Sequence, residues 1–405
     1  MGKPYHTHDT QASGETYLDH IAASPVREEV LEVMTPLLAD GFGNPQSVHR
    51  RGQKAAEVLE RAREQVASLV GARPEEVVFT ATGSEANNLA VKGIALTRMK
   101  HSRRLIVSAI EHLSVFNPAK RLVKEGFEFE VLPVDRYGLV SVEDLREALK
   151  PGAALVSIIH ASTEIGTISP IEELGTVCRE AGVPLHTDAW GTAGCIPLDM
   201  AELGASTLAL AGQNFGGPPG AAALVVRKGT RLSPLIEGGI QERSIRSGQE
   251  NIPAIAGMGE AARLAASETE QRIAHLTPIR DAIIERLPAA IENLIRTGHP
   301  EKRLPNHASF CVEFIEGEGL LLFLDQMGVM AASGSACTSK ALKASHVLEA
   351  IGLDAATAQG SIVFTLGMEN SMEDVDRLVA AMKPVVSRLR EMSPLYKRKD
   401  DGSVQ

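Results

Sequence analysis

Short apolar runs alternate with segments of helical spacing along residues 77–187. The runs have the length and apolar character of buried strands, and they cover residues 77–80, 105–108, 127–133, 155–160 and 184–187. The segments between them carry apolar residues at helical spacing, as expected for connecting helices. This alternation predicts an α/β fold with a mainly parallel sheet that is covered by helices on both faces.

Polar residues stand at or just beyond the ends of several predicted strands. In open parallel sheets, ligands bind at the carboxyl ends of the strands, so side chains placed there are candidates for a functional site. The residues at these positions are Ser84, Glu111, His112, Thr163, Glu164, Asp188, Gln213 and Asn214. We therefore expect a binding or catalytic site to draw on this set.

The pattern changes after Pro305. Residues 308–314 and 361–366 are strand-like, and helical spacing covers residues 317–327, 345–351 and 372–389. These elements predict a smaller α+β domain at the C-terminal end. We divide the chain into a flexible tail (residues 1–16), a large domain (17–265), a small domain that carries Cys337 (266–395) and a second flexible tail (396–405).

The bulk properties exclude several classes of function. The chain has 405 residues and a formal net charge of −10, whereas binding nucleic acid as the main partner needs a basic face. Its four cysteines, Cys178, Cys195, Cys311 and Cys337, form no C-x-x-C pair and suggest no disulfide framework. Residues 1–16 are polar and no apolar run is long enough to span a membrane, so we expect a cytoplasmic protein without a membrane partner.

Cys337 lies in an unusual stretch. Small residues surround it from residue 333 to residue 339, and Lys340 and Lys343 follow. Small side chains do not shield the sulfur, and nearby lysines favour the thiolate, which is the form that acts as nucleophile and metal ligand. A buried structural cysteine is the alternative, but glycine and serines pack a core poorly. The stretch therefore predicts an exposed, reactive thiol.

Several short motifs stand in an order that points to one family. They are Tyr17-Leu18-Asp19, Phe42-Gly43-Asn44-Pro45, Ser84-Glu85-Ala86-Asn87-Asn88, Glu111-His112, Glu164-Ile165-Gly166-Thr167, His186-Thr187-Asp188-Ala189, Arg246-Ser247-Gly248 and the Cys337 stretch. With them the chain resembles the cysteine desulfurases of the class V aminotransferase group, which have fold type I of the pyridoxal phosphate (PLP) enzymes. The Cys337 stretch is similar to the longer-loop class of that family. The resemblance implies that a lysine holds PLP as a Schiff base and that the loop cysteine removes sulfur from cysteine as a persulfide.

The resemblance also implies roles for single residues. His112 matches the residue stacked on the PLP ring, Asp188 matches the acid at the ring nitrogen, and Ser84 keeps a hydroxyl in the phosphate-binding turn. Asn214 stands at the position of the Schiff-base lysine, and Gln213 replaces a phosphate-contacting histidine. Because an amide nitrogen is not nucleophilic, we expect no Schiff base at position 214.

Two more positions bear on the cofactor and the substrate. Val363 replaces the arginine that would grip the carboxylate of the substrate, so free cysteine is expected to bind poorly. Trp190 follows Asp188 closely and either fills part of the pocket or packs beside the sheet. We therefore expect no covalently bound cofactor. PLP held non-covalently and an iron–sulfur cluster shared with a partner through Cys337 are the alternatives.

Three hypotheses of function follow. The first is a pseudoenzyme in which Cys337 carries a persulfide or ligates a cluster, in sulfur transfer or iron–sulfur cluster assembly. The second is an enzyme with altered chemistry that binds PLP or a related anion non-covalently through Ser84, His112 and Asp188. The third is an active cysteine desulfurase in which another residue replaces the lysine. The resemblance implies a homodimer, with an iron–sulfur scaffold or another sulfur acceptor as its partner protein.

Overall fold

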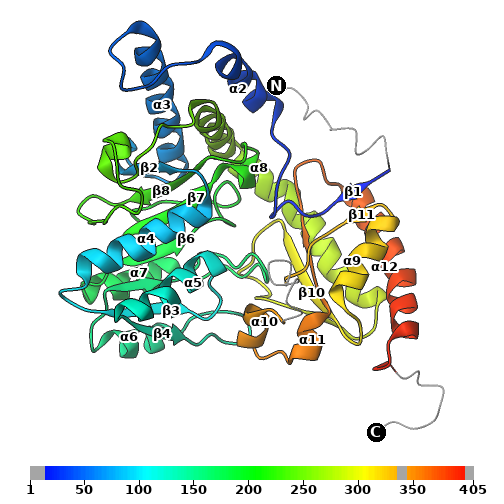
Figure 1. The fold of residues 1–405 in the computed structure, drawn as a ribbon. Coiled ribbons are helices and arrows are strands. Elements are labelled where there is room, and N and C mark those ends of the chain that lie inside the picture. The colour runs from blue at the N-terminus through cyan, green and yellow to red at the C-terminus, as the bar shows by residue number, and fades with distance from the viewer. Residues whose placement is uncertain (1–13, 335–343, 397–405) are drawn as a thin grey trace.

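The computed structural model describes residues 14–334 and 344–396, and its largest element is a seven-stranded sheet (Figure 1). In spatial order the strands are β2 (Val77–Thr80), β8 (Ala222–Val226), β7 (Thr207–Ala211), β6 (Leu185–Asp188), β5 (Leu155–Ser157), β3 (Arg104–Ser108) and β4 (Glu128–Leu132). Only β8 runs against its neighbours, and all other pairs in this sheet are parallel. The predicted α/β class with a mainly parallel sheet is therefore confirmed.

Helices cover both faces of this sheet because successive strand residues point to opposite sides. Leu105 and Val107 of β3 pack in one apolar cluster with α4 (Gly83–Arg98) and α5 (Leu113–Leu122). Ile106, between them, packs in a second cluster on the other face. The helices of that second cluster are α2 (Glu28–Asp40), α3 (Arg50–Leu69), α6 (Val142–Leu149), α7 (Ile171–Glu180) and the first half of α8 (Ile252–Ala290).

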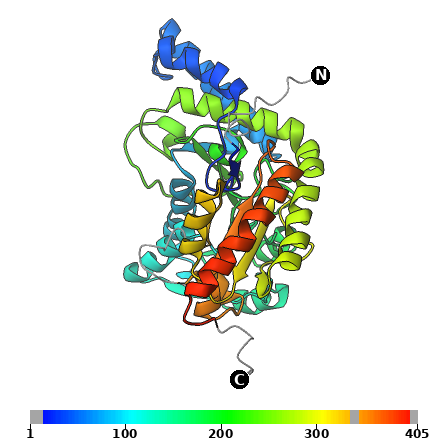
Figure 2. The same cartoon turned by 90° about the vertical axis from the view of Figure 1, so that its right-hand side faces the viewer.

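A second core lies around a smaller antiparallel sheet. Its strand order is β12 (Ser361–Thr365), β10 (His307–Val312) and β9 (Leu294–Arg296). The second half of α8, together with α9 (Gly317–Gln326) and α12 (Met372–Met392), supplies the other side of this core. Figure 2 shows α12 and the lower part of α8 running beside each other along this part of the molecule. The short helices α10 (His346–Ala350) and α11 (Ala355–Gln359) pack in a separate apolar cluster that includes Cys311 of β10 and Ile165.

The α8 helix joins the two cores without a break at the predicted division between residues 265 and 266. Ala265 packs in the core of the large sheet, and Leu276 packs in the second core. The division into two domains at this point therefore stays a prediction. The first strand of the described chain is β1 (Thr16–Tyr17), which pairs in parallel with β11 (Val329–Met330), so Thr16 belongs to a strand and not to the predicted tail.

Two strands of the large sheet were not predicted from the sequence. The segments Thr207–Ala211 and Ala222–Val226 are short apolar runs rich in alanine, and alanine is depleted in strands. Burial between β6 and β2 decides their structure instead, since every residue of both segments is buried. The predicted strand over residues 155–160 is shorter than expected and ends at Ser157. Within the described ranges, no helix has the length and apolar character needed to cross a membrane.

Candidate functional site

A cavity of about 240 Å³ lies where the large sheet meets the small one. Its lining comes from the N-terminal segment, the first turns of α4 and α5, the segments after β5 and β6, and the small sheet with its loops. The lining residues are Asp19, Ile21, Ala22, Gly83, Ser84, Asn87, His112, Leu113, Ser114, Ile159, Thr163, Glu164, Asp188, Trp190, Ala332, Ser333, Gly334, Ser345, His346 and Val363. Five residues of the candidate set thus line one cavity: Ser84, His112, Thr163, Glu164 and Asp188.

Asp188 ends β6 at the carboxyl edge of the sheet and is only 3% exposed. Its Oδ2 accepts a hydrogen bond of 2.7 Å from Nδ2 of Asn87, and its Oδ1 accepts one of 3.0 Å from the backbone N–H of Trp190. Burial raises the pKa of this carboxyl, because the charged form loses its hydration. The carboxylate is therefore fixed in position by two donors at one end of the cavity.

Asn87 is itself held by a buried histidine. Its Oδ1 lies 3.0 Å from Nε2 of His186, and Nδ1 of His186 lies 3.0 Å from Oγ1 of Thr207. Burial lowers the pKa of His186 to about 3, so the ring is neutral and carries one N–H. Because Nδ2 of Asn87 donates to Asp188, its Oδ1 must accept from Nε2 of His186. A chain of hydrogen bonds thus runs from β7 through β6 and α4 to the carboxylate of Asp188.

His112 is the N-cap residue of α5. Its Nδ1 accepts a hydrogen bond of 3.2 Å from the backbone N–H of Ser114 and lies 2.7 Å from the hydroxyl of the same residue. Since Nδ1 is the acceptor, the proton of the neutral ring is on Nε2. The same capping bond fixes the ring at the edge of the cavity.

Two glutamates, buried Glu111 and partly buried Glu164, stand close to this site. Glu164 lines the cavity, and burial raises its pKa to about 7, while the hydroxyl of Ser345 donates to its Oε2. Glu111 lies behind the cavity, accepts hydrogen bonds from Ser108 and Ser157, and has its pKa raised to about 7 by burial. Both carboxyls therefore take up and release protons near neutral pH.

Gln213 and Asn214 do not line the cavity. They lie in a short 3-10 turn, Gly212–Phe215, that follows β7. Nδ2 of Asn214 donates a 2.6 Å hydrogen bond to the carbonyl oxygen of Trp190, and Nε2 of Gln213 donates one of 3.1 Å to that of Ala22. Asn214 therefore contacts the site only through Trp190.

Trp190 occupies one wall of the cavity. A Cβ atom placed on Gly83 would lie 2.8 Å from Cε3 of Trp190, so the indole ring packs directly over this glycine. Its Nε1 donates a hydrogen bond of 3.3 Å to the carbonyl oxygen of Ile21. The ring is thereby fixed between the N-terminal segment and the first turn of α4, and it takes up space beside Ser84.

Cys337 and the residues from 335 to 343 lie outside the described part of the chain. The residues on either side of that stretch, Ser333, Gly334 and Ser345, line the cavity. The other three cysteines, Cys178, Cys195 and Cys311, are free, and burial raises the pKa of each thiol to about 12. A raised pKa leaves each of these three thiols protonated and therefore unreactive at neutral pH.

Residues 16–378 match the family model described as Aminotransferase class-V. The chain is 46% identical to cysteine desulfurase IscS 1 of Archaeoglobus fulgidus over 94% of its own length and 100% of the relative, and 43% identical to cysteine desulfurase IscS of Dictyoglomus turgidum over 95% and 97%. Among solved structures, a NifS-like protein superposes with a TM-score of 0.87 at 33% identity, covering 93% of this chain and 100% of the other. The chain therefore belongs to the class V aminotransferase family. The two relatives given above carry the name cysteine desulfurase.

The expectation that no cofactor is covalently bound is wrong. The same holds for its two alternatives, non-covalent PLP and an iron–sulfur cluster shared through Cys337. The chain is similar along its whole matched length to cysteine desulfurases, which use covalently bound PLP. The expectation rested on the residue type at position 214, but Asn214 does not line the cavity, so its type alone does not decide how a cofactor is held. Because the relatives are named as enzymes, the comparisons also give no support to a pseudoenzyme.

The described lining fits the ring and the phosphate of PLP. Asp188 and His112 are the kinds of side chain that contact a pyridine ring, and the first turn of α4 with Ser84 presents backbone N–H groups to an anion. Covalent attachment needs a primary amine, and no lysine stands among the described lining residues. Those residues therefore account for orientation of the cofactor and not for its attachment.

Sequence reasoning missed the role of Asn87, and it placed Glu164 in the candidate set without its partner Ser345. Asn87 lies in α4 and donates the hydrogen bond that orients Asp188. Glu164 accepts a hydrogen bond from Ser345, which follows the Cys337 stretch in the sequence. An asparagine one turn after Ser84, inside an otherwise apolar stretch of helix, was the available signal for Asn87. No local signal could have paired Glu164 with Ser345, which lies 181 residues further along the chain.

Proposed function

We propose that this protein transfers sulfur through Cys337, which takes up one sulfur atom as a persulfide and passes it to an acceptor protein. The observation that carries the proposal is that described residues on both sides of residues 335–343 line the cavity. Ser333 and Gly334 before it and Ser345 after it line the cavity together with His112 and Asp188. The similarity to cysteine desulfurases over nearly the whole chain supports the same chemistry.

The sulfur step needs no net oxidant or reductant. The thiolate of Cys337 attacks the terminal sulfur of a donor persulfide, a new S–S bond forms, and the donor leaves as a thiolate. Passing the sulfur on repeats this exchange with a thiolate of the acceptor protein. Glu164, with a pKa of about 7, supports the proposal as a group at the edge of the cavity that can hold or release a proton during these exchanges.

The absence of an arginine or lysine from the described lining favours a persulfide as the immediate sulfur source. A cysteine substrate brings a carboxylate, and a carboxylate in a cavity is stabilised by an arginine or lysine. Among the described lining residues there is neither, and Val363 of β12 contributes an apolar surface instead. We propose that Asn214 stands at the lysine position of the family motif and supports the Trp190 wall of the cavity.

Desulfuration of free cysteine is the second candidate function. It is favoured by the relatives, which are named cysteine desulfurases at 46% and 43% identity. PLP, when bound, would supply an electron sink for breaking the carbon–sulfur bond. In that case Asp188, His112 and Ser84 would orient the cofactor, and Cys337 would again accept the sulfur.

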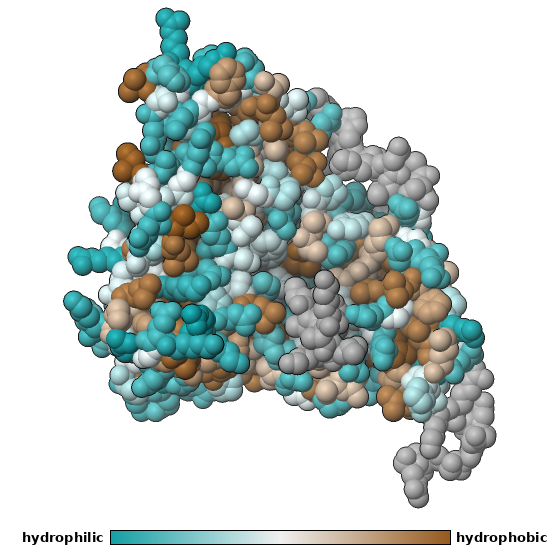
Figure 3. Space-filling view, viewed as in Figure 1, coloured by the Kyte–Doolittle hydropathy of each residue, from teal (hydrophilic) through white to brown (hydrophobic). Residues whose placement is uncertain are grey.

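We propose a homodimer as the working assembly, with a scaffold or other sulfur-acceptor protein as a transient partner. Large apolar side chains are exposed along the segment from α2 to α3: Leu38 is 69% exposed, Phe42 67% and Val48 91%. Figure 3 shows brown, apolar atoms gathered over these elements at the top of the molecule. Exposed apolar groups of this kind mark a contact surface, and a second copy of the chain is the partner that the family resemblance implies.

Two sulfur sources separate the candidate functions in one experiment. The purified protein is incubated with glutathione persulfide, or with L-cysteine and PLP, and the Cys337 peptide is then weighed by mass spectrometry. Sulfur transfer from a persulfide predicts an added sulfur atom with the first source. Desulfuration predicts it with the second, together with alanine. The Cys337→Ser variant must lose the added sulfur, and Cys195→Ser, which removes a partly buried thiol outside the cavity lining, must retain it.

A further inference from the structure

A second pocket lies at the opposite edge of the large sheet, away from the cavity described above. It has a volume of about 410 Å³ and is formed where β6 and β7 begin and β8 ends, beside the last turns of α4 and α7. We call it the arginine pocket. Its basic lining residues are Arg98, His101, Arg179, Arg227 and Arg231, and its described lining includes no aspartate or glutamate. An acidic protein with a net charge of −10 thus concentrates positive charge at one concave site.

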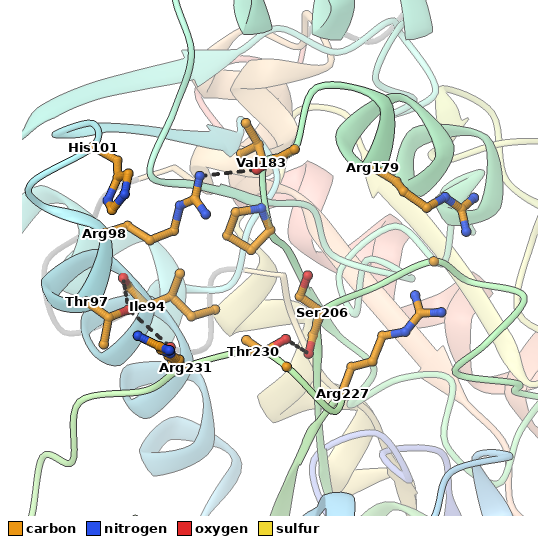
Figure 4. A pocket seen from close by; sticks show the side chains of 14 residues that line it. Ile94, Thr97, Arg98, His101, Arg179, Val183, Ser206, Arg227, Thr230 and Arg231 are labelled. Carbon is orange, nitrogen blue, oxygen red and sulfur yellow. Dashed lines mark hydrogen bonds between the residues drawn. The ribbon is translucent and has the colours of Figure 1, made fainter.

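The arginines face each other across this pocket (Figure 4). Arg98 and His101 lie on the α4 side, while Arg179 of α7 and Arg227 after β8 point toward one another on the other side. Two guanidinium groups that face each other repel, and the repulsion is relieved when an anion lies between them. Among the described residues, Arg227 and Arg231 have no carboxylate partner.

Structural roles account for part of this cluster only. Nη2 of Arg98 donates to the carbonyl oxygen of Gly182, and Nη2 of Arg179 donates to the hydroxyl of Thr176. Both arginines also stand in the last turns of their helices, where a positive charge offsets the helix dipole. Arg227 and Arg231 follow a strand and have no such role. Nε of Arg98 is also buried without an acceptor among the described residues.

The charges decide which ligand the pocket suits. Each helix C-terminus contributes roughly half a negative charge, which is much less than four guanidinium groups. Guanidinium groups bind phosphate with paired hydrogen bonds and are the side chains of choice for it. A volume of about 410 Å³ is within the usual range for small-molecule sites. Because positive groups lie on two walls, the ligand must carry more than one anionic centre.

We infer that the arginine pocket binds a small anion with two or more phosphate groups. This inference is independent of the proposed sulfur transfer, because the pocket shares no residue with the cavity near Asp188. Gly182 and Gly229 leave its rim open, since a Cβ added to either would meet no atom within 4 Å. The ligand would therefore enter without movement of the backbone at these two positions.

Calorimetric titration of the full-length protein with inorganic pyrophosphate tests the inference. Saturable binding is expected, weakening as salt is added, because the site is exposed to solvent. Arg227→Gln and, separately, Arg179→Gln are expected to weaken it by roughly ten- to a hundredfold. Arg61→Gln, which removes an exposed arginine of α3 outside the pocket, is the matched control and should leave it unchanged. The melting temperature of each variant shows that it is folded, and Arg231→Gln replaces any variant that is not.

Two results would overturn the inference. One is the absence of pyrophosphate binding, or binding that Arg227→Gln, Arg179→Gln and Arg231→Gln all leave unchanged. The other is binding of a polyglutamate peptide at this pocket that is as tight as that of pyrophosphate, which would make it a docking surface for an acidic protein. Binding of adenosine triphosphate in competition with pyrophosphate would support the inference and place a nucleotide among its ligands.

Discussion

Nδ2 of Asn87 donates a hydrogen bond of 2.7 Å to Oδ2 of Asp188, across 101 residues of sequence. The bond joins the second turn of α4 to the end of β6 and so ties a helix to the strand that presents the carboxylate. It stabilises the ionised form of Asp188 against the burial that raises its pKa. The position of the carboxylate in the cavity therefore depends on a residue that donates to it from another element.

Asn87→Ala is expected to lower the free energy of unfolding by about 1–3 kcal/mol. The substitution leaves Asp188 with the backbone N–H of Trp190 as a donor, and it leaves Nε2 of buried His186 without its acceptor. Urea denaturation at neutral pH measures the loss. Asn117→Ala, which truncates an exposed asparagine of α5, should change stability by no more than about 0.5 kcal/mol. Equal effects of the two substitutions would contradict the role given to Asn87.

Glu164→Gln is expected to flatten the pH dependence of stability between about pH 4.5 and pH 7. The folded-state pKa of about 7 lies above the ordinary value of 4.5, so in this range the folded protein retains a proton that the unfolded chain releases. The contribution is thus fully present below pH 4.5 and is lost as pH rises to 7. For the shift of Glu164 this amounts to roughly 3 kcal/mol.

The measurement for Glu164 is the difference in unfolding free energy between variant and wild type at several pH values. Taking the difference cancels buried His160, His186 and His307, whose lowered pKa values act in the opposite direction. The amide oxygen of glutamine still accepts from Ser345, so the hydrogen bond is kept. A difference that stays constant from pH 4.5 to 7 would show that Glu164 ionises normally.

Gly83→Ala is expected to displace the indole ring of Trp190 and to cost about 1–3 kcal/mol of stability. The new Cβ would lie 2.8 Å from Cε3, closer than the ring can tolerate. Trp190 is the only tryptophan of the chain, so its fluorescence emission reports the change directly. Gly319→Ala in α9 is the control, because its Cβ would meet only the end of a leucine side chain at 3.3 Å. If both variants gave the same emission spectrum, the indole ring of Trp190 could not lie directly over Gly83.

PLP added to the protein is expected to quench Trp190 fluorescence to a plateau. Ser84 and Trp190 line the same cavity, and Ser84→Ala should weaken the apparent affinity by roughly two- to tenfold through loss of one hydrogen bond. Ser233→Ala, outside this lining, should leave the titration unchanged. Quenching that never saturates, or that is the same in the Ser84→Ala variant as in the wild type, would mean that PLP does not enter this cavity.

Much of the fold was predictable because strand and helix alternate with clear periodicity from residue 77 onward. The strands that escaped prediction, β7 and β8, are alanine-rich and owe their structure to burial between neighbouring strands. Ser84, His112 and Asp188 converge because each stands at or just beyond the carboxyl end of a strand, which is a rule of topology that sequence alone can apply. Asn87 follows from no such rule, since its partner is set by how α4 lies on the sheet.

The polar contacts of Asn214 and Trp190 were likewise beyond sequence reasoning. From the sequence, an asparagine at position 214 predicts that no Schiff base forms there. In the structure its side chain lies outside the cavity and donates to the carbonyl oxygen of Trp190. The direction of a side chain that follows a strand depends on the turn it enters, here Gly212–Phe215. Family membership and not this one residue therefore decides the class of cofactor.

The mass of the Cys337 peptide tests sulfur transfer most directly. The protein is isolated without reductant, its thiols are blocked by alkylation, and the peptides that carry its four cysteines are weighed. Sulfur transfer through Cys337 predicts one added sulfur atom on the Cys337 peptide, loss of that atom on treatment with a reductant, and none on the peptides of Cys178, Cys195 and Cys311. An unmodified Cys337 peptide, even after incubation with glutathione persulfide and with L-cysteine and PLP, would contradict it.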